Sequence, residues 1–386
     1  MAKKAKTETK ALKLNVGEFK TMVAKAIKGC SSNADILMTQ LMAVELKDGV
    51  LRLITTDYSN YLYVQKDKVA GDDFYVVVYA DKFARLISKL TSENVEMSVK
   101  TGASGTTDCL VIKADGNYSL DLPYDENGDL VKFPDPVEDA DDEDWNEADT
   151  KLSTLRLIMT TAKSSVLPTN EQSSGSPYTG YFMGKQAVTT DTFSMCGIDI
   201  EMFDPAVLVH SDLVNLLDVL TKEDVHVKYS EEEIEFITSD VIVYGKLMDN
   251  VDEFPIDAVE ALLDEPYPSS CKIDRTKLVS LLDRLVLFVN DKIDGGEIDI
   301  AFTKDGIAIT SKSQSGHELI PYIESTNFTD FVCSTNINVL ISIIKSNHAE
   351  QIVVNYGKDT GLKISEGNVK QIVPFADDSD DEEEEE

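Results

Sequence analysis

One short pattern occurs three times in this chain, and it limits the folds that the chain can adopt. Each occurrence holds four apolar residues at positions i, i+3, i+4 and i+7, which places them on one face of a helix that must be buried. The patterns start at Phe83, Leu213 and Ile337, roughly 125–130 residues apart. This period is too long for a solenoid, so we predict three copies of one small domain.

A polar residue stands two positions before each of these apolar stripes. The three residues are Asp81, Ser211 and Thr335. Side-chain oxygens of Asp, Ser and Thr accept a hydrogen bond from the free N–H groups of a first helical turn. We therefore predict that all three residues are N-caps.

Each copy also contains an earlier helix and several strands. The earlier stripes start at Phe19, Leu155 and Leu278, and a short strand precedes each one. Alternating β-formers around polar turns indicate antiparallel hairpins. The predicted fold class is α+β, with three similar domains per chain, each a βαβββ unit written twice. The predicted domains are residues 11–141, 142–267 and 268–376, followed by an acidic tail at 377–386.

The charge of the chain is strongly negative but unevenly distributed. The 386 residues include 36 Lys and Arg against 70 Asp and Glu, which gives a net charge of −34. Eight acids lie between Glu138 and Asp149 and nine between Asp377 and Glu386. We expect both runs to be solvated and flexible, the second as a disordered tail. A protein this acidic is not expected to bind nucleic acid over its whole surface.

Sequence motifs of enzymes and metal sites are absent. The chain has no Walker A, GxGxxG, HExxH or GxSxG motif, and its five cysteines and four histidines are scattered without a CxxC pair. Residues 125–136 begin like a calcium loop, but Leu130 and Pro136 stand where such a loop needs glycine and glutamate. We predict no catalytic residue, no cofactor and no metal, in a reduced cytoplasmic protein without a membrane span.

Two copies share the sequence Thr-Thr-Asp, at residues 55–57 and 189–191. A paired active site is one interpretation of this repeat. The favoured interpretation is a turn, because Thr and Asp side chains commonly hydrogen-bond to the backbone of their own turn.

The positive charge concentrates in the predicted helices. Residues 17–29, 80–90, 151–167, 211–223, 272–289 and 335–350 hold 15 of the 36 Lys and Arg but only 8 of the 70 Asp and Glu. The cations on their polar faces are Lys20, Lys25, Lys28, Lys82, Arg85, Lys89, Arg156, Lys163, Arg275, Lys277 and Arg284. A solvated helix face would explain them by itself, because Lys and Arg are good helix formers. Combined with the threefold repeat, the segregation favours a surface that faces a phosphate backbone.

Several short sequences, taken in order, resemble those of a known family. They are Leu14–Val16, Leu51–Asp57, Ala80–Phe83, Tyr118–Leu120, Asp144–Trp145, Ala187–Asp191, Asp252–Pro255 and Val373–Phe375. In their order and spacing, over about residues 12–375, the chain resembles the bacterial-type DNA polymerase III β sliding clamps, as a divergent member of bacterial or phage origin. The resemblance implies three domains per chain and two chains closed head to tail into a ring, with helices facing duplex DNA and sheets outside.

The resemblance also implies roles for individual residues. A ring interface would join Tyr118 and Leu120 of one chain to Leu287 and Phe288 of the next. The alternative is that all four lie in the cores of their own domains. A partner-peptide pocket between the second and third domains would contain Thr179, Thr190, Met195, Pro255, Val373, Pro374 and Phe375. The alternative is that Val373 and Phe375 belong to the last core strand and Met195 to an ordinary hairpin.

Two features depart from the family pattern. Thr192, Phe193 and Ser194 stand where the clamps usually have Gly-His-Arg, and the chain continues into its acidic tail. Both changes lie at the expected pocket. A partner peptide is therefore expected to depend more on apolar anchors and less on a carboxylate.

The expected function is that of a non-enzymatic DNA sliding clamp, a processivity factor that encircles duplex DNA and tethers a replicative polymerase. The expected partners are duplex DNA without sequence preference, a DNA polymerase, a clamp loader and a second copy of the chain, with no membrane. The alternative is an acidic scaffold or DNA-mimic protein that binds basic partners through its outer surface. An enzyme comes third.

Overall fold

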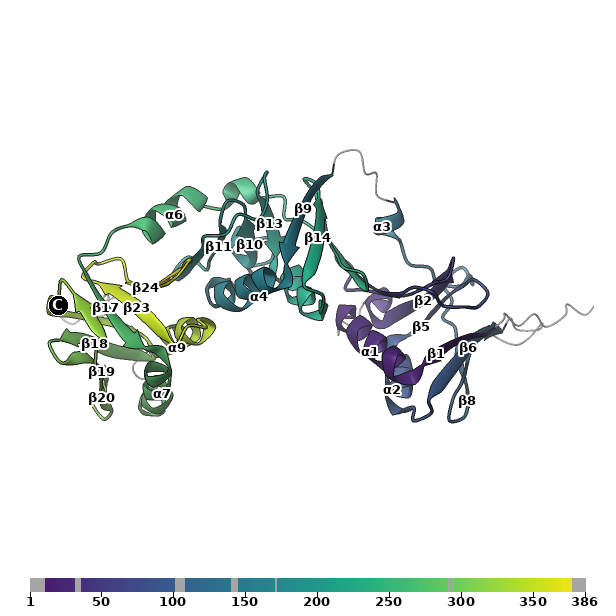
Figure 1. Ribbon diagram of the computed structural model, residues 1–386, viewed down its shortest axis with the longest axis horizontal. Helices are drawn as coiled ribbons and strands as arrows, with labels where there is room; N and C mark the ends of the chain where they lie inside the picture. The colour runs from purple at the N-terminus through teal and green to yellow at the C-terminus, as the bar shows by residue number, and fades with distance from the viewer. Residues whose placement is uncertain are drawn as a thin grey trace, which may run out of the picture. The chain divides into compact units, whose positions relative to one another are not determined.

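The structure is a computed structural model of the chain (Figure 1). It describes residues 11–31, 36–100, 108–139, 145–170, 172–290, 292 and 295–376. The chain forms two compact units. Unit 1 consists of Met1–Leu152 and Asp212–Leu247, and unit 2 of Ser153–Ser211 and Met248–Glu386. The predicted disordered tail and the predicted boundary at residue 141 lie outside the described residues.

Unit 1 contains two antiparallel sheets. The first has the strand order β1-β6-β7-β8, formed by Leu12–Asn15, Asn94–Lys100, Cys109–Lys113 and Asn117–Asp121. The second has the order β5-β2-β3-β4-β16-β15-β14-β9, formed by Phe74–Tyr79, Leu41–Lys47, Val50–Thr56, Asn60–Lys66, Val241–Lys246, Glu233–Ile237, Asp224–Tyr229 and Asn146–Lys151. Its helices are α1 (Val16–Ala26), α2 (Ala80–Lys89), the short α3 (Pro136–Asp139) and most of α5 (Ser211–Leu216).

Unit 2 also contains two antiparallel sheets. One has the order β13-β10-β11-β12-β25-β24-β23-β17-β21, formed by Val207–His210, Gly180–Met183, Ala187–Thr190, Met195–Ile198, Val369–Val373, Leu362–Glu366, Gln351–Tyr356, Ser269–Asp274 and Glu324–Thr326. The other has the order β20-β19-β18-β22, formed by His317–Ile320, Gly306–Ser311, Glu297–Thr303 and Phe331–Asn336. Its helices are nearly all of α4 (Leu152–Thr161), α6 (Ile256–Asp264), α7 (Arg275–Leu285) and α9 (Ile337–Ser346).

The strands follow the duplicated βαβββ plan, so the predicted α+β fold of three similar units is confirmed. In the first copy, β1-α1-β2-β3-β4 is followed by β5-α2-β6-β7-β8, and the first strand of each half pairs with the three-stranded meander of the other half. The last strands of the meanders then join neighbouring copies, because β4 pairs with β16 and β12 pairs with β25. The exact domain boundaries stay predictions.

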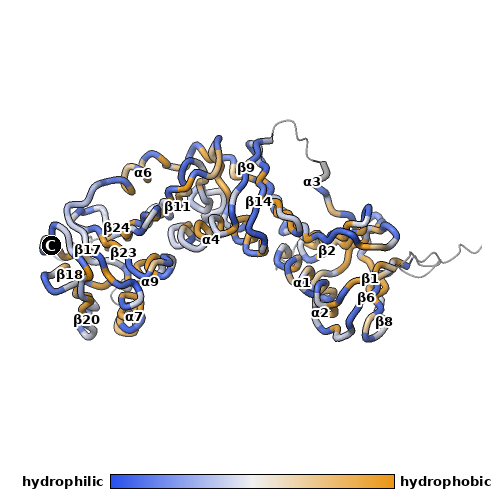
Figure 2. The backbone as a smooth tube through the Cα atoms, in the orientation of Figure 1, coloured by the Kyte–Doolittle hydropathy of each residue, from blue (hydrophilic) through white to orange (hydrophobic). Residues whose placement is uncertain are grey.

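The helices bury the apolar stripes that the sequence predicts. Phe83 and Ile87 of α2 are fully buried, as are Ile337 and Ile344 of α9. The ring of Phe19 on α1 meets that of Phe83 edge to face, with centroids 6.0 Å apart. In Figure 2, hydrophobic and hydrophilic residues alternate along the helices and strands, as the burial of one face requires.

The three predicted N-caps are wrong. Helix α2 begins at Ala80, so Asp81 lies inside its first turn and pairs with Arg85. Helix α5 begins at Ser211 itself. The cap of α9 is Asn336, whose side chain accepts hydrogen bonds from Asn338 N and Val339 N, while the Thr335 hydroxyl donates to Pro374 O. Asn has the same capping ability as the three predicted residues, so residue type alone did not identify the first helical residue.

Strands β2 and β18 and helix α6 are among the elements that were not predicted. Each carries a readable signal. Ile298, Ile300 and Phe302 of β18 alternate and are buried, and Val259 and Leu263 of α6 are buried four residues apart. Helix α6 packs over β12 and β25 in unit 2.

Candidate nucleic-acid and partner interfaces

The cations of unit 1 lie on α1, α2 and the turn that follows α1. Lys82 and Lys89 are exposed, and Lys20 is partly exposed. Arg85 forms an i, i+4 ion pair with Asp81 at 2.8 Å, which in solvent stabilises little and leaves the guanidinium accessible. Lys28 forms a similar exposed pair with Asp218.

Lys25 differs from the other cations of unit 1. Its side chain is 15% exposed, and its Nζ donates to the carboxylate of Asp240 and to the hydroxyl of Thr221, both at 2.9 Å. Asp240 lies in the turn between β15 and β16, and β16 is the strand that pairs with β4. The structure therefore uses Lys25 to hold two copies of the repeat together, which leaves less of its charge for a phosphate.

The predicted DNA-facing cations of unit 2 also include accessible side chains and side chains that are held by other residues. Arg156, Lys163 and Lys277 are exposed. Arg284 forms a two-pronged ion pair with Glu318 of β20, and this hydrogen bonding lowers the pKa of the Glu318 carboxyl. Arg275 donates a hydrogen bond from Nε to Ala349 O at 2.5 Å. This bond links the start of α7 to the segment that follows α9.

The predicted DNA-facing residues therefore divide by their availability. Five of these cations have no carboxylate partner among the residues that the structure describes. The five are Lys20, Lys82, Lys89, Lys163 and Lys277. Helix α5 and the turn after it add Asp212 and Asp218, so the helical surface is not uniformly positive.

The residues predicted for a ring interface lie on or near two free sheet edges. In the described chain, β8 and β20 are the two meander-ending strands without a second neighbour. Leu287 and Phe288 follow α7 beside β20 and are 79% and 50% exposed. Tyr118 on β8 is partly exposed, whereas Leu120 is 6% exposed and lies in the core of its own sheet. Leu120 is therefore corrected from a contact residue to a support of the edge.

Sequence reasoning missed Leu319, which is 48% exposed on β20. A cavity of about 320 Å³ lies between α7 and β20, and Leu281, Arg284 and Leu319 are among its lining residues. Leu319 alternates with the buried Ile320 along the strand, which is the pattern that would have identified it.

The two Thr-Asp turns have the same hydrogen bonds, as the favoured interpretation expects. In unit 2 the Asp191 carboxylate accepts from Phe193 N at 3.0 Å and from Ser194 N at 2.6 Å, and the Thr190 hydroxyl donates to Ser194 O. Asp57 and Thr56 make the equivalent bonds in unit 1. Asp and Thr therefore shape a turn at each site. In unit 2 this turn leaves the Phe193 side chain 71% exposed.

The predicted pocket residues do not all reach the surface. Thr179, Thr190 and Val373 are buried, with exposed fractions of at most 2%, so they are corrected from peptide contacts to structural positions. Phe375 packs partly buried against the core of the third copy, and its ring lies 6.1 Å from that of Phe331. The alternative interpretation of Val373 and Phe375 as core residues agrees with this packing.

Met195 and Pro255 belong to a different cluster, beneath and beside α6. Met195 packs on a core of Val188, Leu208, Phe254, Val259, Leu263 and Ile372. Pro255 is the N-cap residue of α6 and is partly exposed. Pro374 is also partly exposed, and its carbonyl is held by Thr335. Met195 and Pro255 are thus partly exposed beside α6, and their role in a peptide pocket stays a prediction.

Thr192 carries backbone strain that a mutation can release. Its φ is +81°, a left-handed conformation that a β-branched residue rarely adopts and that glycine adopts freely. We expect Thr192→Gly to raise the free energy of unfolding by about 0.5–1 kcal/mol, because the strain relieved exceeds the added entropy of the unfolded chain. Thermal or denaturant unfolding measures this difference. Thr192→Ala keeps a Cβ and should recover little, and a glycine variant less stable than the wild type would contradict the strain.

Three cysteine thiols of the described residues are kept protonated by burial. Burial raises the pKa of the Cys30, Cys271 and Cys333 thiols to about 12, so they are protonated and unreactive at neutral pH. Within the described ranges, no group of three His, Cys, Asp or Glu residues is placed to hold a metal ion. Across the same ranges, no helix is long and apolar enough to span a membrane.

Comparison with known proteins gives structural matches. No family model matches the sequence, and no curated protein matches it. The DNA polymerase sliding clamp of Bacillus subtilis matches with a TM-score of 0.80 at 14% identity, over 96% of this chain and 99% of that chain. The DNA polymerase III β subunit of Thermotoga maritima matches with 0.76 at 18% identity, over 96% and 100%. The sliding clamp of Pseudomonas aeruginosa, bound to griselimycin, matches with 0.79 at 15% identity, over 96% and 100%. Along nearly its whole length, this chain has the fold of the bacterial DNA polymerase III β sliding clamps.

Proposed function

We propose that this protein is a non-enzymatic DNA sliding clamp, in which two copies of the chain close into a ring around duplex DNA. The single observation that carries this proposal is the pattern of strand pairing. The chain repeats one meander six times, and β4 with β16 and β12 with β25 already join four of the six through their last strands. The edges that remain, β8 and β20, are equivalent to those that pair. An antiparallel pair of β8 from one copy with β20 from the next satisfies both edges.

Exposed apolar residues support this closure. Leu287, Phe288 and Leu319 are solvent-exposed beside β20, although Leu281 and Ile320 next to them are buried. Large apolar side chains at an unpaired sheet edge favour association, because each costs free energy in water. The head-to-tail arrangement is heterologous, and a closed ring leaves neither β8 nor β20 unpaired.

The helix cations support the binding of duplex DNA without sequence preference. Lys20, Lys82, Lys89, Arg156, Lys163 and Lys277 are long, flexible cations that reach phosphates and do not read base edges. The acidic remainder of the chain repels DNA elsewhere, so contact is restricted to the helical face.

The proposed cellular role is processivity, with a replicative DNA polymerase and a clamp loader as partners in the cytoplasm of a bacterial or phage-infected cell. The three domains proposed for the ring are residues 11–141, 142–267 and 268–376. Partners would dock on the outer sheet face of unit 2, around Met195 and Pro255, where apolar side chains are partly exposed.

Loading onto DNA of two topologies tests this function. With a clamp loader and ATP, the protein should remain bound to nicked circular duplex and be lost when the circle is cut to a linear form. Solution mass should equal two chains. A monomer that loads on neither DNA would refute the clamp and favour the acidic scaffold.

A further inference from the structure

A cavity of about 590 Å³ lies in unit 1, where the end of α1 meets the start of α2. This volume is in the range of pockets that hold small organic ligands. The lining residues come from the turn η1 (Ile27–Gly29) and the residues after it, from η2 (Leu37–Gln40), and from the junction of β5 with α2. Figure 1 shows α1 and α2 side by side, and the proposed DNA-facing cations of unit 1 lie on these helices and on η1.

Tyr79 is an exposed aromatic residue in the wall of this cavity. It is the last residue of β5, and its backbone pairs with that of Leu41 in β2, which fixes the position of its Cα. Val76 and Val78 before it are buried, but the Tyr79 side chain is 47% exposed. In the described part of the chain, neither a hydrogen bond nor another aromatic ring engages this side chain. The Tyr79 ring is therefore available to stack on a planar ring of a ligand.

Other lining residues add polar and charged groups to the Tyr79 ring. Gln40 is partly exposed, and an amide side chain can both donate and accept hydrogen bonds. Lys82 is exposed and has no carboxylate partner among the described residues. Asp81 also lines the cavity, but it pairs with Arg85 at 2.8 Å, which offsets its charge. One cavity thus combines an aromatic face, an amide and an unpaired cation.

A nucleotide with an unpaired base has groups that complement all three. Its base can stack on an aromatic side chain, its base edge can hydrogen-bond to an amide, and its phosphate can pair with a lysine. A base inside a duplex cannot stack on Tyr79, because its neighbours in the helix cover both of its faces. A phosphate without a ring would leave the Tyr79 face exposed to water. The chemistry of the cavity therefore favours an unpaired nucleotide over duplex DNA or a simple anion.

We propose that this cavity binds one unpaired nucleotide of single-stranded DNA, with its base on Tyr79 and its phosphate at Lys82. A strand is favoured over a free nucleotide, because the neighbouring phosphates of a strand can also contact the exposed Arg85 and Lys89 further along α2. This inference rests on the proposed function, because the same helices are proposed to hold duplex DNA. The cavity would receive a strand that continues unpaired beyond the end of that duplex.

Two labelled DNA probes test this site on the full-length protein at low salt, with fluorescence anisotropy as the readout. One probe is a single-stranded oligothymidylate of ten nucleotides, and the other is a blunt duplex of ten base pairs. Tyr79→Ala should weaken binding of the single strand about tenfold, because stacking on an aromatic side chain contributes strongly to single-strand affinity. The same change should leave binding of the duplex unaltered, since it removes no charge.

Matched variants identify the site. Tyr79→Phe keeps the aromatic ring and should bind the single strand like the wild type. Tyr58→Ala removes another exposed tyrosine of unit 1, outside the cavity, and should also bind it like the wild type. Lys82→Gln should weaken binding of the single strand more than Lys89→Gln, which changes an exposed lysine at the other end of α2. Circular dichroism confirms that each variant is folded.

The proposal is overturned if the single strand does not bind, if Tyr79→Ala binds it as tightly as the wild type, or if Tyr58→Ala weakens its binding equally. Unlabelled thymidine monophosphate should displace the single strand poorly at the same concentration of nucleotide, and equal displacement would overturn the assignment to a strand. A dimer that loads on DNA without any effect of Tyr79→Ala keeps the proposed function and loses this inference. A monomer that never loads, but whose single-strand binding depends on Tyr79, keeps the nucleotide site and loses the clamp.

Discussion

Replacing Leu287 and Phe288 together with alanine is expected to convert the ring into a folded monomer. Both side chains are largely exposed in the single chain, so their loss should cost the fold little. Large apolar anchors at an interface typically contribute about 2 kcal/mol or more each, so losing two should weaken association by roughly a thousandfold. Analytical ultracentrifugation at micromolar concentration, with circular dichroism for the fold, measures both effects.

A control pair separates this effect from a general loss of apolar surface. Ile36 and Leu37 are also adjacent and exposed, at 36% and 46%. They precede β2, whereas Leu287 and Phe288 lie beside the free edge strand β20. Ile36→Ala with Leu37→Ala should leave the mass at two chains. If the Leu287 and Phe288 variant stays a dimer at micromolar concentration, the ring closes elsewhere.

Reversing six helix cations that are exposed or partly exposed is expected to abolish stable loading on DNA while preserving the ring. The residues are Lys20, Lys82, Lys89, Arg156, Lys163 and Lys277, each changed to glutamate. Six cations that contact phosphates contribute strongly to the affinity for DNA, as the steep salt dependence of such binding shows. Replacing these cations with repulsive charges should reduce the affinity for DNA on the order of 10³-fold or more. Retention on nicked circular duplex and stimulation of a polymerase measure the loss.

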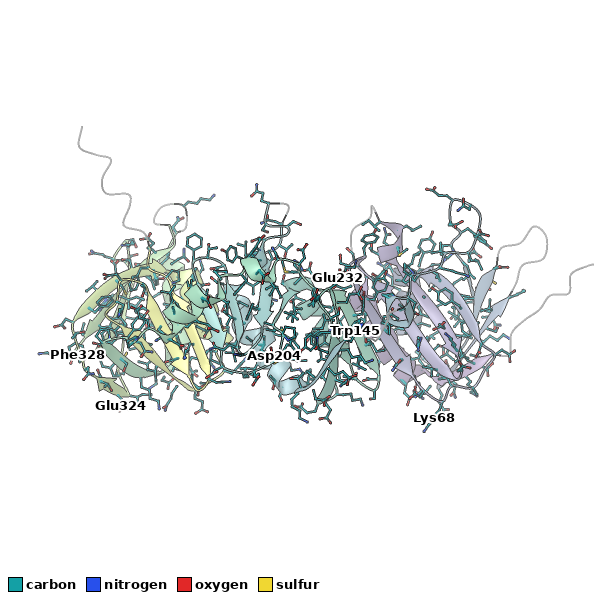
Figure 3. The ribbon with its side chains drawn as sticks, turned by 90° about the horizontal axis from the view of Figure 1, so that it is seen from above. Lys68, Trp145, Asp204, Glu232, Glu324 and Phe328 are labelled. Atoms are coloured by element: carbon teal, nitrogen blue, oxygen red, sulfur yellow. The ribbon has the colours of Figure 1, made fainter. Side chains whose placement is uncertain are left out.

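The matched control reverses six exposed lysines outside these helices. They are Lys13, Lys68, Lys132, Lys185, Lys246 and Lys304. Figure 3 shows Lys68 at the edge of unit 1. The control variant has the same net charge and should load like the wild type. Equal loading by both variants would show that the helices do not face DNA.

Hydrophobic periodicity predicted the repeated architecture, because the spacing of apolar residues within one helix or strand determines which of its faces is buried. The stripe beginning at Phe83 and its counterparts in α5 and α9 each specify which helix face is covered, whatever lies above it. The repeat then limits the fold to one unit used three times. The same reasoning located the cations on the helices, since apolar residues on one face leave the opposite face to Lys and Arg.

The sequence alone determined the α+β class, the duplicated βαβββ plan and the positions of the six main helices. Tertiary structure decided which groups remain available. Lys25 is held by Asp240, Leu120 and Val373 are buried, and Leu319 is exposed on β20, which has no second neighbouring strand in the described part of the chain. The Lys25 pair depends on a residue 215 positions away, and the open edge at β20 depends on the absence of a second neighbouring strand among the described residues. Periodicity within one element reports which face is buried, but it contains no information about which partner covers that face or which edge stays open.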